Sequence, residues 1–263
     1  MQIIDIHTHV YPDEIAQKAA DSVQDFYGMG ERTMDGTVDM LLRRGAEAGI
    51  SHYVILPVAI RPDRAQGIND FIVRQVAAHK ELFGFGTVHA AMDDPAAEAQ
   101  RVRDMGLLGI KMHPDSQQFP IDDPRLFPMY EAMQGQFPVI FHMGDLRYDY
   151  SHPARLRRLL DLFPRLDVIA AHFGGYQMYE TAYELLRDTD CIFDISSSLM
   201  LMPDGVPEKF IGLYGAERMA YGTDYPMWDP VREVPRFLGL KLPEAEIEQI
   251  AWKTAARFLN LDI

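Results

Sequence analysis

Short apolar runs alternate with longer amphipathic segments along the whole chain. Most of the short runs are rich in Val, Ile or Phe and are bounded by Gly, Pro or Asp, which is typical of buried parallel strands. Eight such runs cover residues 3–9, 52–58, 82–88, 107–113, 137–143, 166–172, 191–196 and 218–224. The pattern therefore predicts eight strands.

The segments between these runs carry apolar residues at helical spacing. Asn69 is expected to cap a helix that ends near residue 79, and Asp94 and Asp123 each precede a proline that suits the first helical position. Further helices are expected over residues 155–163, 180–186 and 243–259. Strands and helices in alternation predict an α/β fold, a (β/α)8 TIM barrel that forms a single domain over residues 1–263.

An open doubly wound sheet is the alternative architecture. No strand is followed by the Gly-rich fingerprint of dinucleotide-binding folds, so we prefer the barrel. The gap between the first two strands is longer than the others, which predicts an insertion after strand 1 over residues 11–32. This insertion is a candidate lid over the barrel mouth, and its Tyr11, Phe26, Tyr27 and Met29 are candidates for shaping a pocket.

Composition restricts the functions that this fold can serve. The 263 residues include 25 Lys and Arg against 39 Asp and Glu, and the formal net charge of −14 repels nucleic acid and anionic membrane surfaces. Cys191 is the only cysteine, which excludes an intrachain disulfide framework and a cysteine-based zinc site. No apolar run approaches the ~20 residues of a membrane span, and Asp5 falls where a signal peptide would need an apolar core. We expect a cytoplasmic protein.

Polar residues collect where the predicted strands end. Side chains alternate along the first strand, so Asp5, His7 and His9 share one face while Ile4, Ile6 and Thr8 share the other. The apolar face is expected to meet the helices, which turns the polar face into the barrel. Two imidazoles ~6–7 Å apart along a strand can converge on one metal ion.

Later strands end in the same way. His142, His172 and Asp224 close the fifth, sixth and eighth strands, and Lys111 and His113 share a face at the end of the fourth. Catalytic groups of such barrels lie at the carboxyl ends of the strands, so these side chains are expected at one rim. One histidine at a strand end is more often structural than a ligand, but several at one rim indicate a site.

Several motifs follow one another in a fixed order. They are DIHTH at residues 5–9, GIKMHP at 109–114, IFHMG at 140–144, AAHFGG at 170–175, YGTDYP at 221–226 and the closing IAWKTAARFLNL. Together they resemble the amidohydrolase superfamily of metal-dependent TIM barrels, in the branch called amidohydrolase-2, which also holds aminocarboxymuconate-semialdehyde decarboxylase. The resemblance covers nearly the whole chain, and the DxHxH start is specific only in combination with the later residues.

The resemblance also implies a site. By position, the metal ligands are His7, His9, His142 and Asp224. This donor set suits one divalent ion, Zn²⁺ first and Mn²⁺ as the alternative. His172 is then a catalytic histidine near a metal-bound water, and Asp224 also accepts a proton. Some superfamily members bridge two metals through a carboxylated lysine on strand 4, but GIKMHP is more similar to the mononuclear branch, so Lys111 is not assigned a bridging role.

Two reactions fit such a site. Hydrolysis of a small amide, lactone or ester by a metal-activated water is the leading hypothesis. The alternative is non-oxidative decarboxylation of a small carboxylic acid, for which a cationic residue near the leaving carboxylate is favourable. We assign substrate binding to Arg61, Lys111, His113 and Arg147. Tyr225 and Trp228 near the predicted mouth are explained equally well by packing.

A non-catalytic binding barrel is the third class, and it is disfavoured because burying the complete ligand set is costly. The expected partner is a small-molecule substrate, without nucleic acid or membrane, and a homodimer is the base-rate expectation for the oligomeric state.

Overall fold

The computed structural model describes residues 1–28, 34–261 and 263. The chain divides into two compact units, each of which is considered by itself. The first unit joins Met1–Ile55 to Ile195–Ile263, and the second unit is Leu56–Asp194. Among the described residues, no helix combines the length and the apolar character that a membrane crossing needs.

The second unit is built on short parallel strands. These are β3 (Leu82–Gly84), β4 (Gly86–Thr87), β5 (Ile110–Met112), β6 (Val139–Phe141), β7 (Val168–Ala170) and β8 (Ile192–Asp194). From β4 to β8, each strand pairs in parallel with the next one along the chain. Lys111 is level with Ile140 and Ile140 with Ile169, so the strands end close to one another along a common edge.

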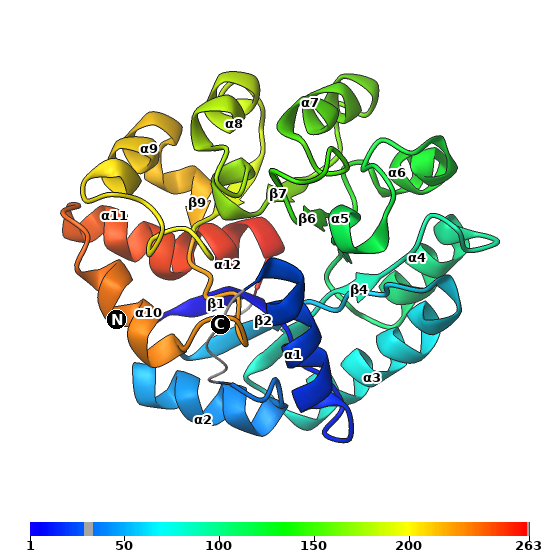
Figure 1. Ribbon diagram of the computed structural model, residues 1–263, viewed down its shortest axis with the longest axis horizontal. Helices are drawn as coiled ribbons and strands as arrows, with labels where there is room; N and C mark the ends of the chain where they lie inside the picture. The colour runs from blue at the N-terminus through cyan, green and yellow to red at the C-terminus, as the bar shows by residue number, and fades with distance from the viewer. Residues whose placement is uncertain (29–33, 262) are drawn as a thin grey trace. The chain divides into compact units, whose positions relative to one another are not determined.

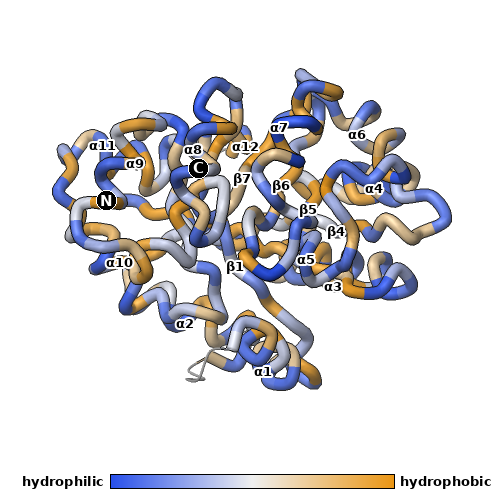
Figure 2. Tube along the Cα trace, turned by 45° about the horizontal axis from the view of Figure 1, so that its top comes forward, coloured by the Kyte–Doolittle hydropathy of each residue, from blue (hydrophilic) through white to orange (hydrophobic). Residues whose placement is uncertain are grey.

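Helices follow the strands of the second unit and lie outside them (Figure 1). They are η1 (Pro62–Arg64), α3 (Ala65–Ala78), α4 (Pro95–Asp104), α5 (Pro114–Gln117), η2 (Pro124–Leu126), α6 (Phe127–Met133), α7 (Pro153–Leu162), η3 (His172–Gly174) and α8 (Tyr179–Leu186). Hydrophilic and hydrophobic residues alternate along outer helices such as α4 and α7 (Figure 2). The expected caps are confirmed: Asp94 accepts the N–H of Ala97, and Asp123 accepts that of Arg125.

The expectation that Asn69 begins a helix is wrong. α3 starts at Ala65, and Asn69 lies inside it, fully buried. Its side chain accepts the N–H of Thr87 and donates to the carbonyl of Thr87 and to Glu98. The amide therefore anchors β4 to α3, a long-range role that overrides its preference for a helix terminus.

The first unit contains β1 (Ile4–Thr8), β2 (His52–Ile55) and β9 (Met219–Ala220). β1 pairs in parallel with β2, with Ile4 level with His52. On its other side β1 bonds to the chain around and after β9: the Ile6 N–H donates to Tyr221, and the N–H of Asp224 donates to the carbonyl of His7 at 2.8 Å. The end of β1 and the segment that follows β9 are therefore held side by side.

The helices of the first unit are α1 (Ala16–Tyr27), α2 (Val38–Ala48), α9 (Val206–Tyr214), η4 (Ala216–Arg218), α10 (Pro230–Leu238), α11 (Glu244–Glu248), η5 (Gln249–Lys253) and α12 (Thr254–Leu259). α2 and α10 pack together (Figure 1). Arg44 of α2 pairs with Asp229 at the start of α10. The helix expected over residues 243–259 is confirmed, but η5 is a π-helical turn within it. The carbonyl of Ile250 in this turn accepts the N–H of Tyr221.

Every predicted strand is present, in a shorter form than its apolar run. The run over residues 82–88 is divided at Phe85 between β3 and β4. Apolar residues beyond the strand ends, such as Leu107 and Phe137, are buried without joining the hydrogen-bonded ladder, which explains why the runs are longer than the strands. Neither unit alone holds a closed ring of strands among its described residues.

Candidate functional site

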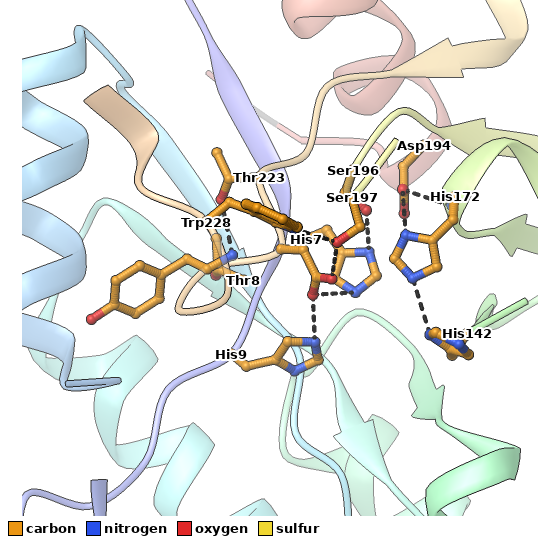
Figure 3. A network of polar contacts seen from close by, with 12 residues as sticks. His7, Thr8, His9, His142, His172, Asp194, Ser196, Ser197, Thr223 and Trp228 are labelled. Carbon is orange, nitrogen blue, oxygen red and sulfur yellow. Dashed lines mark hydrogen bonds and ion pairs between the residues drawn. The ribbon is translucent and has the colours of Figure 1, made fainter. Parts of the chain in front are cut away.

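Three polar side chains converge in the first unit. Nε2 of His7 lies 3.5 Å and Nε2 of His9 3.3 Å from Oδ1 of Asp224, and the two imidazole rings meet edge to face (Figure 3). All three side chains are largely shielded, with exposed fractions of 1% for His7, 13% for His9 and 15% for Asp224. The alternation along β1 has placed both histidines against the acid that follows β9, as expected from the sequence.

This group fits a divalent metal ion. Two imidazole nitrogens and one carboxylate oxygen are common ligands of Zn²⁺ and Mn²⁺. Ligands that each lie about 2.1 Å from one tetrahedral ion are about 3.4 Å apart, which is close to both measured separations. The candidate ligand atoms of His7, His9 and Asp224 all lie within 4.8 Å of one another. Little rearrangement is therefore needed for these three side chains to bind one ion.

Asp5 has a different task from the histidines on its strand. Its carboxylate accepts the backbone N–H groups of His7 at 3.1 Å and Thr223 at 3.0 Å, and the hydroxyl of Thr223 at 2.5 Å. A buried carboxylate with several donors forms strong charge-assisted hydrogen bonds. Asp5 thus ties β1 to the residue before Asp224 and fixes the distance between the histidines and that acid.

Ser196 and Ser197, which the sequence did not single out, support this group together with Trp228, for which the sequence left packing as an equal explanation. Oγ of Ser196 lies 3.1 Å from Nδ1 of His7, so the opposite ring nitrogen is the one that faces Asp224. The hydroxyl of Ser197 donates to Oδ2 of Asp224, and Nε1–H of Trp228 donates to Ser197 at 2.8 Å (Figure 3). Serines are too common in loops for their presence alone to indicate such contacts.

Tyr11 of the predicted insertion lies close to this group. Its ring occupies the space that a side chain at Gly36 would need, with a Tyr11 carbon 2.8 Å from the position of a β-carbon. Burial and the negative charge of Asp224 raise the pKa of Tyr11, so its hydroxyl stays protonated. The insertion also contains α1, where Phe26 and Tyr27 meet edge to face, whereas Met29 lies outside the described residues.

A second cluster lies at the strand ends of the second unit. Nε2 of His172 is 3.0 Å from Nδ1 of His142, and Nε2 of His142 is 3.1 Å from the carbonyl oxygen of Gly144 (Figure 3). Both ring nitrogens of His142 therefore have a partner within this cluster, and a metal ion bound by His142 would have to displace one of them. The side chain of Asp194 accepts the backbone N–H of His172. The backbone of His172 is in the left-handed region, with φ 59°.

His113 joins this cluster by stacking. Its ring lies flat on that of His142, with centroids 3.8 Å apart and an interplanar angle of 6°. Nδ1 of His113 accepts the N–H of Ser116 at the start of α5. Asp115 follows on α5, and its Oδ2 accepts the hydroxyl of Ser151 and lies 4.0 Å from Nε2 of His142. Burial, more than any neighbouring charge, raises the pKa of Asp115 to about 6.

The remaining residues assigned to substrate binding are placed differently. Lys111, on β5, is fully buried. Arg61 and Arg147 lie on loops after β2 and β6, with exposed fractions of 62% and 45%. Arg61 makes a forked ion pair with Asp63, and Arg147 makes one with Asp145. A substrate carboxylate would have to compete with these neighbouring acids.

Comparison with known proteins identifies the fold. A search among curated proteins finds no significant match. Among solved structures, an uncharacterised TIM-barrel protein from Bordetella bronchiseptica has a TM-score of 0.82 at 21% identity, covering 99% of both chains. A 2,6-dihydroxybenzoate decarboxylase from Rhizobium has a TM-score of 0.75 at 19% identity, covering 100% of both chains. A dihydroxybenzoic acid decarboxylase from Polaromonas, with bound manganese and the inhibitor 2-nitroresorcinol, has a TM-score of 0.76 at 18% identity, covering 99% of this chain and 97% of that one.

These similarities confirm the TIM-barrel fold predicted from the sequence. The family model described as amidohydrolase matches residues 4–261, which is nearly the whole chain. Its span includes the DIHTH start, the strand-end histidines and the YGTDYP motif on which the resemblance rests. The chain therefore belongs to the amidohydrolase superfamily of enzymes, in its amidohydrolase-2 branch.

Proposed function

We propose that this protein is a metal-dependent, non-oxidative decarboxylase of small aromatic carboxylic acids. The observation that carries the metal dependence is the convergence of His7 and His9 on Oδ1 of Asp224. Several structures with the same fold are decarboxylases of dihydroxybenzoic or carboxyvanillic acids, and three of them contain bound manganese. Their substrates support decarboxylation over the hydrolysis that the sequence favoured.

The proposed ion is a single divalent metal, with Mn²⁺ now as well supported as Zn²⁺. When bound, it supplies a positive centre that holds the substrate oxygens and stabilises negative charge that develops on them. His7 contributes Nε2, because Ser196 occupies its Nδ1, and His9 contributes Nε2 from the same face of β1. The assignment of His142 to this ion stays a prediction.

The reaction replaces a carboxylate by a proton. The bond between the carboxylate and the ring carbon breaks, CO₂ leaves, and the electron pair that stays on the ring carbon takes up a proton from an acid of the protein. The sequence assigns proton transfer to Asp224 and His172. Nε2 of His172 lies 3.0 Å from Nδ1 of His142, and Asp224 keeps Oδ1 towards the histidines of β1 while Ser197 donates to Oδ2. Both groups are buried or nearly so, which limits exchange of the proton with water.

Hydrolysis of a lactone, ester or amide is the second candidate, because the family model itself is described as amidohydrolase. Product analysis separates the two reactions. Manganese-loaded protein is incubated with 2,6-dihydroxybenzoate, 5-carboxyvanillate and a panel of aromatic lactones. We expect CO₂ and the decarboxylated phenol from at least one acid. A ring-opened acid from a lactone, with no CO₂ from any carboxylic acid, would establish hydrolysis instead.

A further inference from the structure

Asp224 is held from behind by a chain of two hydrogen bonds. Nε1–H of Trp228 donates to Oγ of Ser197 at 2.8 Å, and the hydroxyl of Ser197 donates to Oδ2 of Asp224. The other carboxylate oxygen, Oδ1, is the one that faces the histidines of β1. Ser197 and the two histidines therefore contact opposite oxygens of the same carboxylate. Figure 3 shows Ser197 and Trp228 beside the two histidines.

The direction of this chain follows from the chemistry of its members. An indole N–H can only donate, so Ser197 accepts from Trp228. The single hydroxyl proton of Ser197 is then directed at Asp224, and a hydrogen bond to a carboxylate is stronger than one to a neutral acceptor. A carboxylate with one oxygen bonded in this way has a fixed rotamer, and its second oxygen has a defined direction.

The backbone conformations of Ser197 and Asp224 also support a fixed orientation of the Asp224 carboxylate. Ser197 has φ 50° and Asp224 has φ 64°, both in the left-handed region that non-glycine residues rarely adopt. Such conformations persist where the surrounding structure enforces them, and they cluster at functional sites. Here the two left-handed residues hydrogen-bond each other, so each turn orients a side chain towards the other.

We propose that Ser197 and Trp228 are positioning residues that orient Asp224 for metal binding, with Ser196 doing the same for His7. The two adjacent serines thereby fix the carboxylate and one imidazole of the same ligand group from a single loop after β8. This inference rests on the metal site of the proposed function, and it does not depend on which reaction the enzyme performs. Groups that orient metal ligands typically change metal affinity by 10–100-fold when they are removed.

Three single variants, together with the double variant of Ser197→Gly and Trp228→Phe, test the proposal by metal binding alone, without substrate. Ser197→Gly removes the hydroxyl while tolerating the left-handed backbone, so a loss of binding cannot be attributed to added strain. Trp228→Phe keeps the ring and removes the N–H. Trp252→Phe is the matched control, because Trp252 is the other tryptophan of the chain and lies on η5 under the ammonium of Lys253. The dissociation constant for Mn²⁺ is measured by competition with a chromogenic chelator, and thermal unfolding of each metal-free variant is recorded alongside.

We expect Ser197→Gly to weaken manganese binding by about 10–100-fold and Trp228→Phe by less, with no change for Trp252→Phe. Because Trp228 acts through Ser197, the double variant should bind manganese as weakly as Ser197→Gly alone. In the Trp252→Phe background, the remaining fluorescence of Trp228 should respond to manganese, and Ser197→Gly should shift this response to higher metal concentrations.

Unchanged manganese affinity in Ser197→Gly would overturn the proposal, as would losses that simply add in the double variant. Failure of the wild-type protein to bind manganese would contradict both this proposal and the proposed metal dependence. Tight manganese binding without CO₂ release from any acid would contradict the proposed reaction alone, and the positioning of Asp224 would stand.

Discussion

Gly222 lies so close to His7 that a β-carbon at position 222 would be 2.8 Å from Cβ of His7 and 3.2 Å from Cβ of Ser196. Real β-carbons do not approach one another this closely, so a larger residue forces one neighbour to move. The absence of a side chain at Gly222 is therefore what lets the segment before Asp224 pass alongside β1. Gly222 therefore contributes to the site by leaving room for His7 and Ser196, and it has no side chain that could bind metal or transfer a proton.

Gly222→Ala should displace His7 or Ser196 and weaken metal binding. We expect a loss of about tenfold or more in manganese affinity, comparable to other losses of support around metal ligands. Gly212→Ala is the control, because Gly212 lies on α9 in the same unit and a β-carbon there meets no atom within 4 Å. The control should bind manganese normally. Wild-type manganese affinity in Gly222→Ala would show that His7 and Ser196 can move away from the added β-carbon without disturbing the metal ligands.

The histidines of the second unit should separate metal binding from proton transfer. The sequence assigns His142 to the metal and His172 to catalysis. His172→Ala should lower kcat by about 10²–10⁴-fold, as for removal of a general acid or base, with manganese affinity largely kept. His142→Ala should lose both together, while His79→Ala, away from the cluster, should lose neither. Metal analysis and turnover of the three purified variants decide this, and a His172→Ala variant with wild-type turnover would contradict the catalytic role.

Glu233 should make the protein less stable as the pH rises. Burial raises the pKa of Glu233 above its ordinary value of 4.5, although Arg236 partly opposes this. The folded protein thus holds this proton more tightly than the unfolded chain. The associated stability is present below pH 4.5 and is lost as the pH rises through the folded-state pKa.

Glu233→Gln removes this titration, so its free energy of unfolding should improve relative to wild type as the pH rises from about 4 to about 7. Glu248→Gln provides a control of opposite sign. The hydrogen bond from Lys253 lowers the pKa of Glu248, so the stability from that group is present at higher pH and lost on acidification. Urea unfolding at a series of pH values measures how the free energy of unfolding of each variant, relative to wild type, changes with pH. If this difference changed with the same sign in both variants, the opposite pKa shifts of Glu233 and Glu248 would be refuted.

Asn69 should contribute to the free energy of unfolding and should have no direct role in the reaction. Asn69→Leu has a similar size but leaves the N–H and carbonyl of Thr87 without their side-chain partner. Each unsatisfied buried group costs roughly 1–3 kcal/mol, so we expect a loss of about 2–5 kcal/mol in the free energy of unfolding. Gln66→Leu, exposed on the same helix, should change it by less than about 0.5 kcal/mol. Similar values for the two variants would mean that Thr87 finds other partners.

The alternation of side chains explains what the sequence predicted well. A strand points successive residues to opposite faces whatever its neighbours are, so His7 and His9 were expected on one face of β1 and are found there. The strand-end rule likewise placed His142 with His172, whose ring nitrogens are in hydrogen-bond contact. Both inferences need only local geometry and the order of the strands.

Features that depend on contacts between distant segments were not predictable. Ser197 reaches Asp224 because both residues have left-handed backbones, and neither residue type indicates this conformation. Asn69 has the chemistry of a helix cap, but a partner on β4 recruits it into the middle of α3. Arg61 and Arg147 have the chemistry of carboxylate binders, but acids two residues away pair with both.

The metal content of the purified protein tests the proposed centre most directly. Wild type, His9→Ala and Asp224→Ala are loaded with Mn²⁺ under identical conditions, desalted and analysed for metal by mass spectrometry. If His7, His9 and Asp224 hold a catalytic ion, wild type should retain about one equivalent per chain and both variants almost none. A wild-type protein without metal, or variants that retain as much metal as wild type, would contradict the site on which the proposed decarboxylation rests.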